Sequence, residues 1–254
     1  VLANLEDMLK ILVNGQNMLI NVTCNEEAWS NLGSQLSDFL EQLPLAPVQS
    51  YGWSPPEFVG FEGMTIPTQV NYVGKGANLY QLGYRPHGSA QVITRFLRTA
   101  WLWERVRVRG GAYGAFCLFN NLSGTLTFVS YRDPNLTKTV EAFDQTVEFL
   151  RSVDLNEDEL TKSIIGTIGD IDRHLLPDAK GYASMVRWLT ADTDEKRQQM
   201  REQVLSTSAA DFRAFADVLE GVKRDGLVKV IGSPGAVKTA AAERDGWLHV
   251  VKLL

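Results

Sequence analysis

The sequence has 254 residues, of which 44% are hydrophobic and 22% are charged, proportions that favour a folded globular protein over a disordered one. Its net charge at pH 7 is −5 and it has no basic block, so composition gives no support to nucleic-acid binding. No apolar run approaches the ~20 residues that span a bilayer, and two cysteines are too few for a disulfide framework. We therefore expect neither nucleic-acid nor membrane partners.

Residues 1–45 are predicted to form a helix, a strand and a second helix. Leu5, Leu9 and Leu12 fall on one side of the first helix, residues 2–13. The strand covers residues 18–24, and Asn25 caps the helix that follows. Because the chain begins within a helix and without a methionine, we expect it to be part of a longer protein or a processed product.

Residues 46–66 are rich in proline and glycine and have no hydrophobic period. We interpret this stretch as a linker over the surface. It separates residues 1–45, predicted to be the remnant of a preceding domain, from residues 67–254, predicted to form a second domain. The strand–turn–helix pattern of residues 18–43 recurs at 227–243, which weakly favours a duplicated domain.

The second domain begins with two predicted strands, residues 69–74 and 79–84. A helix follows Ser89, and a glycine turn at 109–114 leads into a predicted hairpin of residues 115–120 and 125–131. The later helices and the last strand are predicted at residues 133–150, 156–172, 178–190, 193–205, 208–219, 226–231 (the strand) and 234–243. This order predicts an α+β fold, a mixed, largely antiparallel sheet with helices packed on one face.

The glycine turn is preceded by a candidate functional arginine. With about 100° per residue, Arg107 falls roughly 40° from Ile93, inside the apolar arc of the helix, whereas Arg105 and Arg109 fall on the opposite side. An inward arginine needs a partner or a ligand, because an unpaired buried charge is costly. The spacing leaves two alternatives open: a structural pair with Glu104, three residues earlier, or a ligand-binding role.

Other sources of chemistry are weak. His87, His174 and His249 are far apart and have no metal-ligand neighbour at helical spacing, so no metal site is predicted. The turn at 110–114 is not a phosphate loop, because no lysine follows and it leads into a strand. Two glycines within a predicted helix, Gly166 and Gly169, indicate close helix packing.

Several uncommon motifs occur in a characteristic order, and together they resemble the presequence proteases, organellar members of the pitrilysin-type zinc metalloendopeptidases. The resemblance covers nearly the whole chain and is closest to plant and algal forms. The motifs are Trp101-Leu-Trp-Glu-Arg-Val-Arg-Val, Arg109-Gly-Gly-Ala-Tyr-Gly, Ser130-Tyr-Arg-Asp-Pro-Asn, Ile164-Ile-Gly-Thr-Ile-Gly-Asp and Leu176-Pro-Asp-Ala-Lys-Gly-Tyr.

The resemblance implies a pitrilysin-type (LuxS-like) domain fold in an enzyme of two similar halves that enclose a chamber. The zinc motif His-x-x-Glu-His of such enzymes lies in the N-terminal half and is absent from this sequence. This chain then resembles the end of the third domain and the whole fourth domain. Its partners would be the N-terminal half and peptide substrates, in the mitochondrial matrix or the chloroplast stroma, and alone it would be inactive.

The resemblance also implies site residues. Arg107 and Tyr113 correspond to the pair that reaches the substrate backbone near the scissile bond, and Gly110 and Gly111 would let the substrate approach. Donors placed where negative charge develops on a carbonyl oxygen lower the barrier to peptide hydrolysis. The competing hypothesis is a non-catalytic scaffold or substrate-recognition subunit of the same fold, as in the core proteins of respiratory complexes and the partner subunit of the processing peptidase.

Overall fold

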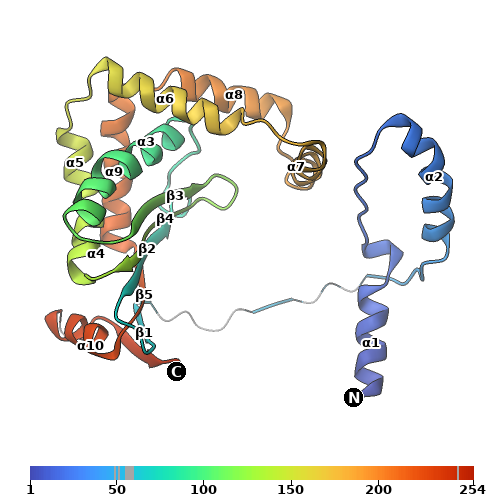
Figure 1. The fold of residues 1–254 in the computed structure, drawn as a ribbon, viewed down its shortest axis with the longest axis horizontal. Helices are drawn as coiled ribbons and strands as arrows, with labels where there is room; N and C mark the ends of the chain where they lie inside the picture. Colours follow the sequence, from blue (N-terminus) through green and yellow to red (C-terminus); the bar gives the residue numbers. More distant parts are fainter. Residues whose placement is uncertain (49, 51, 55–59, 245) are drawn as a thin grey trace. The chain divides into compact units, whose positions relative to one another are not determined.

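The computed structural model describes the chain except for residues 49, 51, 55–59 and 245. The chain forms two compact units (Figure 1). Unit 1 consists of Val1–Pro56 and His174–Thr193, and unit 2 consists of Glu57–Arg173 and Asp194–Leu254. Within the described part of the chain, no helix has the length and apolar character needed to cross a membrane.

Unit 2 is built on a six-stranded sheet in the order β3-β4-β2-β5-β1-β6. The pairs β3–β4, β4–β2 and β2–β5 are antiparallel, and β5–β1 and β1–β6 are parallel. The predicted mixed, largely antiparallel sheet is therefore confirmed. The strands are β1 (Glu62–Thr65), β2 (Asn71–Asn78), β3 (Gly114–Asn120), β4 (Thr125–Asp133), β5 (Leu227–Gly232) and β6 (His249–Lys252).

The helices of unit 2 cover one face of this sheet (Figure 1), as predicted. Paired residues of neighbouring strands point to the same face, so one buried row crosses the sheet through Ala115, Ser130, Val73, Val230 and Gly63. The helices are α3 (Ser89–Leu97), η2 (Arg98–Val108), α4 (Thr137–Asp144), α5 (Thr146–Ser152), α6 (Glu157–Ile171), α8 (Asp194–Leu205), α9 (Ala209–Asp225) and α10 (Pro234–Glu243).

The core lies between this buried face and the helices. Phe128 of β4 stacks on Phe143 of α4 with ring centroids 5.4 Å apart, and Phe96 of α3 meets Phe212 of α9 edge-on at 5.3 Å. Truncation of such a buried phenylalanine to alanine typically costs about 3–5 kcal/mol. Gly166 of α6 leaves room for the Arg95 side chain, which agrees with the predicted close packing, but the prediction is wrong for Gly169, where a Cβ would meet no atom of the described residues beyond its own helix within 4 Å.

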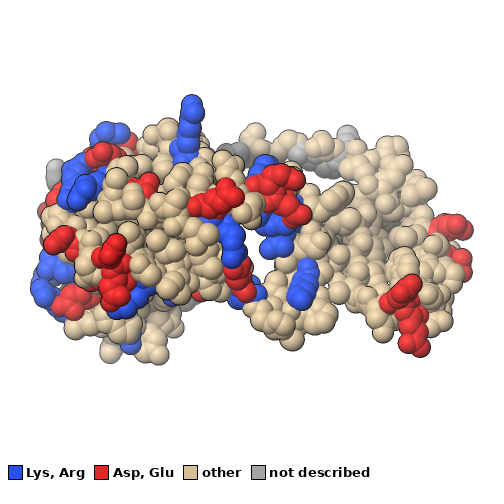
Figure 2. Space-filling model, turned by 90° about the horizontal axis from the view of Figure 1, so that it is seen from above, with Lys and Arg blue, Asp and Glu red and all other residues tan. Residues whose placement is uncertain are grey.

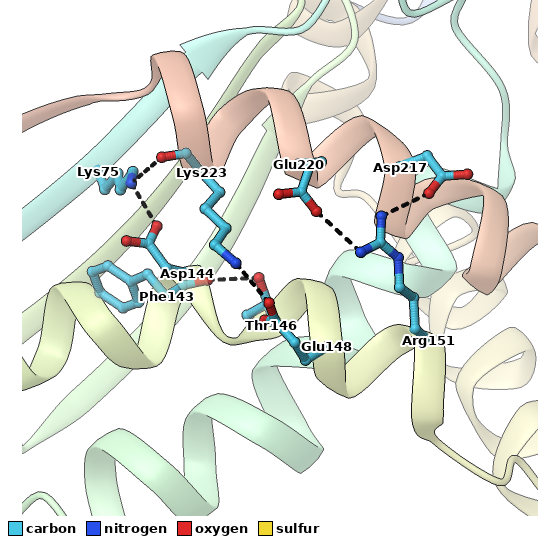
Figure 3. Close-up of polar contacts among 9 residues, drawn as sticks. All are labelled: Lys75, Phe143, Asp144, Thr146, Glu148, Arg151, Asp217, Glu220 and Lys223. Atoms are coloured by element: carbon cyan, nitrogen blue, oxygen red, sulfur yellow. Dashed lines mark hydrogen bonds and ion pairs between the residues drawn. The ribbon is translucent and has the colours of Figure 1, made fainter.

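A buried ion pair joins the sheet to two helices (Figure 3). Lys75 of β2 is 5% exposed, and its Nζ donates to Asp144 Oδ1 at 2.5 Å and to the carbonyl oxygen of Lys223 at 2.9 Å. Asp144 ends α4, and Lys223 lies in the last turn of α9. The nearby pair Lys223–Glu148 is more exposed. The Lys75 ammonium thus fixes both helices against the central strand.

Unit 1 contains α1 (Leu2–Leu12), η1 (Gly15–Asn17), α2 (Glu26–Glu41) and α7 (Pro177–Leu189). Asn14 is buried, and its side chain makes two hydrogen bonds to the backbone of Ala46. Its Nδ2 donates to the Ala46 carbonyl oxygen, and its Oδ1 accepts from the Ala46 N–H. None of its three α-helices buries a residue. Large apolar side chains are exposed on all three.

Four element predictions need correction. The predicted linker 46–66 contains β1, so the folded sheet begins before residue 67, and residues 174–193 group with unit 1. The predicted strand at 18–24 is wrong, because these residues form no strand and join no sheet among the described residues. Residues 79–84 form turns, and the stripe at 136–150 is divided between α4 and α5. The β1 segment Glu-Gly-Met-Thr is too short to show a period.

Candidate functional site

The helix before the glycine turn changes its winding. The α-helical segment α3 continues as the π-helical segment η2, and its winding is still seen where the Arg109 N–H donates to the Glu104 carbonyl oxygen, five residues back, at 3.0 Å. Each turn then holds more residues than an α-helical turn. The buried positions follow steps of five and four, through Leu97, Leu102 and Val106. Because each turn of η2 holds more residues, the residues that face the core lie one position away from those that α-helical spacing predicts.

This shift corrects the predicted orientation of Arg107. Val106, and not Arg107, takes the core-facing position, because the prediction assumed α-helical spacing throughout. Arg107 is half-buried, and its guanidinium carbon lies 3.9 Å from the ring centroid of Trp103. A cation over an aromatic ring is attracted to the ring face, so the Trp103 ring stabilises the Arg107 guanidinium even without an ion-pair partner. In the described residues no carboxylate pairs with Arg107.

The neighbouring arginines have partners of their own. Arg109 Nε donates to Glu104 Oε1 at 2.7 Å, so the predicted alternative of a Glu104–Arg107 pair is wrong. Arg105 is half-buried rather than solvated, and it lies 5.0 Å from the Trp101 ring and donates to Gln145 Oε1 at 3.0 Å. Both side chains are therefore held away from Arg107.

The glycine turn is fixed by backbone and side-chain hydrogen bonds. Gly111 has φ of +80°, a conformation that favours glycine, and its N–H donates to the Arg107 carbonyl oxygen at 3.0 Å. A Cβ at Gly110 would lie 2.5 Å from the Val106 carbonyl oxygen. The Gly110 carbonyl oxygen accepts from Asn135 Nδ2 at 2.6 Å. The turn therefore holds the chain at a set angle between η2 and β3.

Tyr113 follows directly on this turn. Its N–H donates to the Tyr131 carbonyl oxygen at 3.1 Å, which anchors its backbone at the start of β3. The side chain is 68% exposed and lies edge-on to Tyr131, with ring centroids 5.9 Å apart. The side chain is thus accessible to a ligand.

The structure brings Arg107, Tyr113 and Gly111 together around one open hollow of about 610 Å³. The hollow is also lined by Val70, Trp103, Val108, Ala112 and Arg132. Gly110 lies outside it and lines a second depression with Arg105 and Arg109. Arg132 was not predicted from the sequence. The sequence feature that could have indicated it is the Tyr-Arg-Asp run, where the alternation of buried and exposed residues along β4 ends.

Neither a metal site nor a thiol nucleophile is formed by these residues. Among the residues that the structure describes, no group of three His, Cys, Asp or Glu side chains could hold a metal ion. The Cys117 thiol of β3 is buried, and this burial raises its pKa, opposed by the charge of Arg98. A thiol of raised pKa is a poor nucleophile. The arrangement offers cationic and hydroxyl donors.

Comparison with known proteins assigns the chain to one family. Residues 61–233 match the family described as "PreP C-terminal domain". The chain is 43% identical over 253 residues to "Presequence protease 1, chloroplastic/mitochondrial" of Arabidopsis thaliana, an alignment that covers 99% of this chain and 23% of that protein. The chain therefore belongs to the presequence protease family, in the part that this family model describes.

Solved structures agree on the fold. The chain is similar to a protease from Helicobacter pylori, with a TM-score of 0.58 and 15% identity over 82% of this chain and 53% of that one. It is also similar to the structure titled "peptidase M16 inactive domain" from Pseudomonas fluorescens, with a TM-score of 0.52 and 11% identity over 83% and 52% of the two chains. The chain spans about a quarter of the length of the curated relatives that it matches first.

Proposed function

We propose that this chain is part of the C-terminal half of an organellar zinc metalloendopeptidase that degrades cleaved targeting peptides and other short unstructured peptides. Its family membership and its 43% identity to a plant presequence protease support this proposal. The name of that relative says chloroplastic/mitochondrial, which supports our proposal of the chloroplast stroma or the mitochondrial matrix as the location. On the face shown in Figure 2, acidic and basic side chains are mixed over unit 2.

Arg107 and Tyr113 are the residues that we propose to act on the peptide. The observation that carries the proposal is that both line one open hollow, although Arg107 lies in η2 and Tyr113 directly precedes β3. The guanidinium and the phenol each donate hydrogen bonds. In the reaction they would hold the substrate carbonyl oxygen and stabilise the negative charge that develops on it.

Zinc would belong to another part of the longer protein. The sequence lacks His-x-x-Glu-His, and its described residues do not fit a zinc site. The contribution of this chain is confined to binding and to stabilising charge. We expect the isolated chain to hold no stoichiometric zinc and to cleave no quenched fluorescent peptide. Metal analysis after dialysis checks this, and one tightly bound zinc per chain or EDTA-sensitive turnover would contradict it.

We also propose a domain organisation. Residues 1–45 complete a preceding domain of the same type, and most of the rest forms the C-terminal domain. The support is that the helices of unit 1 bury no residue and expose Leu9, Trp29 and Phe39, as expected for helices whose sheet lies elsewhere in the longer protein. The N-terminal half of that protein would be the chain's structural partner.

The test of the site uses the full-length protein. We expect Arg107→Ala and Tyr113→Phe each to lower kcat and kcat/KM by about 10²–10³, because the donors act mainly in the transition state. Zinc content and fold should be unchanged. Tyr113→Phe removes one exposed oxygen and leaves the packing intact. The measurement is steady-state cleavage of a quenched fluorescent peptide.

Arg105→Ala and Arg109→Ala are the matched controls, since both side chains have other partners and lie outside the hollow. We expect each to retain activity within about threefold, as for surface changes of less than ~0.5 kcal/mol. If either control loses as much activity as Arg107→Ala, the proposed role of Arg107 is wrong. A rise in KM alone for Arg107→Ala would assign it to peptide binding without catalysis.

The second candidate function is a non-catalytic scaffold or substrate-recognition subunit. The similarity to a solved M16 domain whose title calls it inactive favours keeping this alternative. The two functions make different predictions for the longer protein. A catalytic protein carries His-x-x-Glu-His in the part that precedes Val1, whereas a scaffold lacks the motif and loses no turnover when Arg107 is replaced.

A further inference from the structure

Strand β4 breaks its own alternation beside the hollow. Leu126, Phe128 and Ser130 are buried at every second position, so the next buried residue should be Arg132. Instead Asp133 is buried and Arg132 is exposed. The register of β2 against β4 shifts at the same place, between Asn71 and Val73. A β-bulge inserts one residue and redirects the side chains that follow, and here it turns Arg132 away from the core.

The backbone of Arg132 carries a conformational cost. Its φ is +50°, in the left-handed region that glycine and asparagine occupy more readily than arginine. In the described residues only one other non-glycine residue, Ala191, has a positive φ. Strained backbone of this kind persists when the surrounding structure fixes it, and it is concentrated at ligand sites. An arginine at this position therefore suggests a role for the side chain.

The surroundings fix Arg132 on both sides. Asp133 is fully buried and accepts hydrogen bonds from the Asn135 N–H at 2.8 Å and from Thr139 Oγ1 at 2.7 Å. The Arg132 carbonyl oxygen accepts from the Tyr113 N–H at 3.4 Å, the same N–H that bonds Tyr131. The backbones of Arg132 and Tyr113 are thus tied together, and both side chains line the same hollow.

The charged side chains described around the hollow are positive, whereas the chain as a whole is negatively charged. Two guanidinium groups, Arg107 and Arg132, line it, and none of the described Asp or Glu residues does, although the chain as a whole has a net charge of −5. Within the described residues, neither arginine forms an ion pair. Two cations that face one space repel each other, and an anion between them relieves the repulsion. The planar guanidinium fork matches the geometry of a carboxylate.

We propose that Arg132 forms a carboxylate-binding subsite beside Arg107 and Tyr113, which takes an Asp or Glu side chain of the bound peptide or its C-terminal carboxylate. This inference rests on the proposed function and adds a preference of the site to it. Arg132 positions the peptide and does not contact the scissile carbonyl. Its loss therefore weakens the binding of carboxylate-bearing peptides and leaves the turnover of neutral peptides in place.

The experiment measures binding to the full-length protein by fluorescence anisotropy. The probes are labelled short peptides with amidated C-termini, in which Glu or its neutral isostere Gln occupies each position in turn. A further Gln peptide has a free C-terminal carboxylate. We expect the native protein to bind the Glu peptide at one position, or the free-acid peptide, about tenfold more tightly than the neutral twin, as for one charge-assisted hydrogen bond.

Arg132→Gly is the decisive variant, because it removes the side chain and relieves the backbone. We expect it to abolish the tenfold preference while neutral peptides bind and are cleaved within about twofold of the native protein. Arg132→Lys should keep part of the preference, and Arg105→Gln, which lies outside the hollow, should keep all of it. A preference that survives in Arg132→Gly, or its absence from every peptide with the native protein, overturns the proposal.

The two proposals fail separately. The anisotropy measurement needs no turnover, so it reports on Arg132 whether or not Arg107 and Tyr113 prove to be catalytic. Loss of carboxylate preference in Arg132→Gly, together with unchanged catalysis in Arg107→Ala, would keep the subsite and remove the oxyanion assignment. A Tyr113→Phe variant that loses turnover but keeps the carboxylate preference would support both proposals.

Discussion

At the scale of single residues, the site combines two positions where backbone and side chain have different preferences. Gly111 adopts a positive φ that its missing side chain allows, and Arg132 adopts one against the preference of its side chain. The first lets the chain turn from η2 into β3, and the second presents a cation to the hollow that the turn creates. The site is therefore built by backbone geometry as much as by side-chain chemistry.

The cost at Arg132 can be measured as stability. We expect Arg132→Gly to raise the free energy of unfolding of unit 2 by about 1 kcal/mol, because left-handed backbone costs non-glycine residues about 1–2 kcal/mol and glycine loses some entropy. Thermal or denaturant unfolding measures the change. Thr127→Gly, on the same strand without a positive φ, should lower stability instead. Destabilisation by Arg132→Gly would show that its side chain holds the bulge.

At the scale of elements, the buried ammonium of Lys75 is the main polar link between the central strand and α4 and α9. We expect Lys75→Met to lower the free energy of unfolding by about 1.5–3 kcal/mol at neutral pH, because it removes the charged hydrogen-bond partner of the half-buried Asp144 carboxylate. The control is Lys223→Met, which breaks an exposed pair with Glu148 and should cost about 1 kcal/mol or less. Equal losses in the two variants would contradict this.

The same pair predicts a pH dependence. Burial raises the pKa of Asp144, and the hydrogen bond and charge of Lys75 oppose that rise. The native state thus holds this proton more tightly than the unfolded chain. The resulting stability is fully present below the ordinary pKa of about 3.9 and is lost as pH rises through the raised pKa. In Lys75→Met the largest opposing effect is gone and only the charges of Arg244 and Lys223 still lower the pKa of Asp144. The loss of stability should therefore be larger at neutral than at acid pH, as denaturation at several pH values would show.

The elements that sequence patterns predicted are those whose pattern is local. The β3–β4 hairpin follows from alternation around Asn-Leu-Ser-Gly, and the helix faces follow from their period. The winding of η2 could not be predicted, since a helical wheel assumes a fixed spacing, and the error moved Arg107 by one position. The Tyr-Arg-Asp run shows where the alternation of β4 ends, but the bulge that exposes Arg132 depends on pairing with β2, some 60 residues earlier.

At the scale of the whole molecule, the two units differ in what they bury. Unit 2 has a continuous core, whereas the helices of unit 1 bury no residue. We expect the amides of α1 and α2 to exchange hydrogen quickly in the isolated chain and slowly in the full-length protein, because tertiary packing supplies most helix stability. The amides of α9 should exchange slowly in both. Slow exchange in α1 of the isolated chain would show that unit 1 is stable by itself.

The placement of β1 has a consequence for how the protein is made. Its four residues pair with β5 and β6, and the contacts Lys229–Glu62 and Thr65–Val251 span 167 and 186 residues of chain. During synthesis β1 therefore has no partner strand on either edge until almost the whole described chain has been made. Closing such long loops is slow. The half of the sheet next to β1 is thus the last part of unit 2 to assemble, and it is the part that depends most on protection from aggregation on the way.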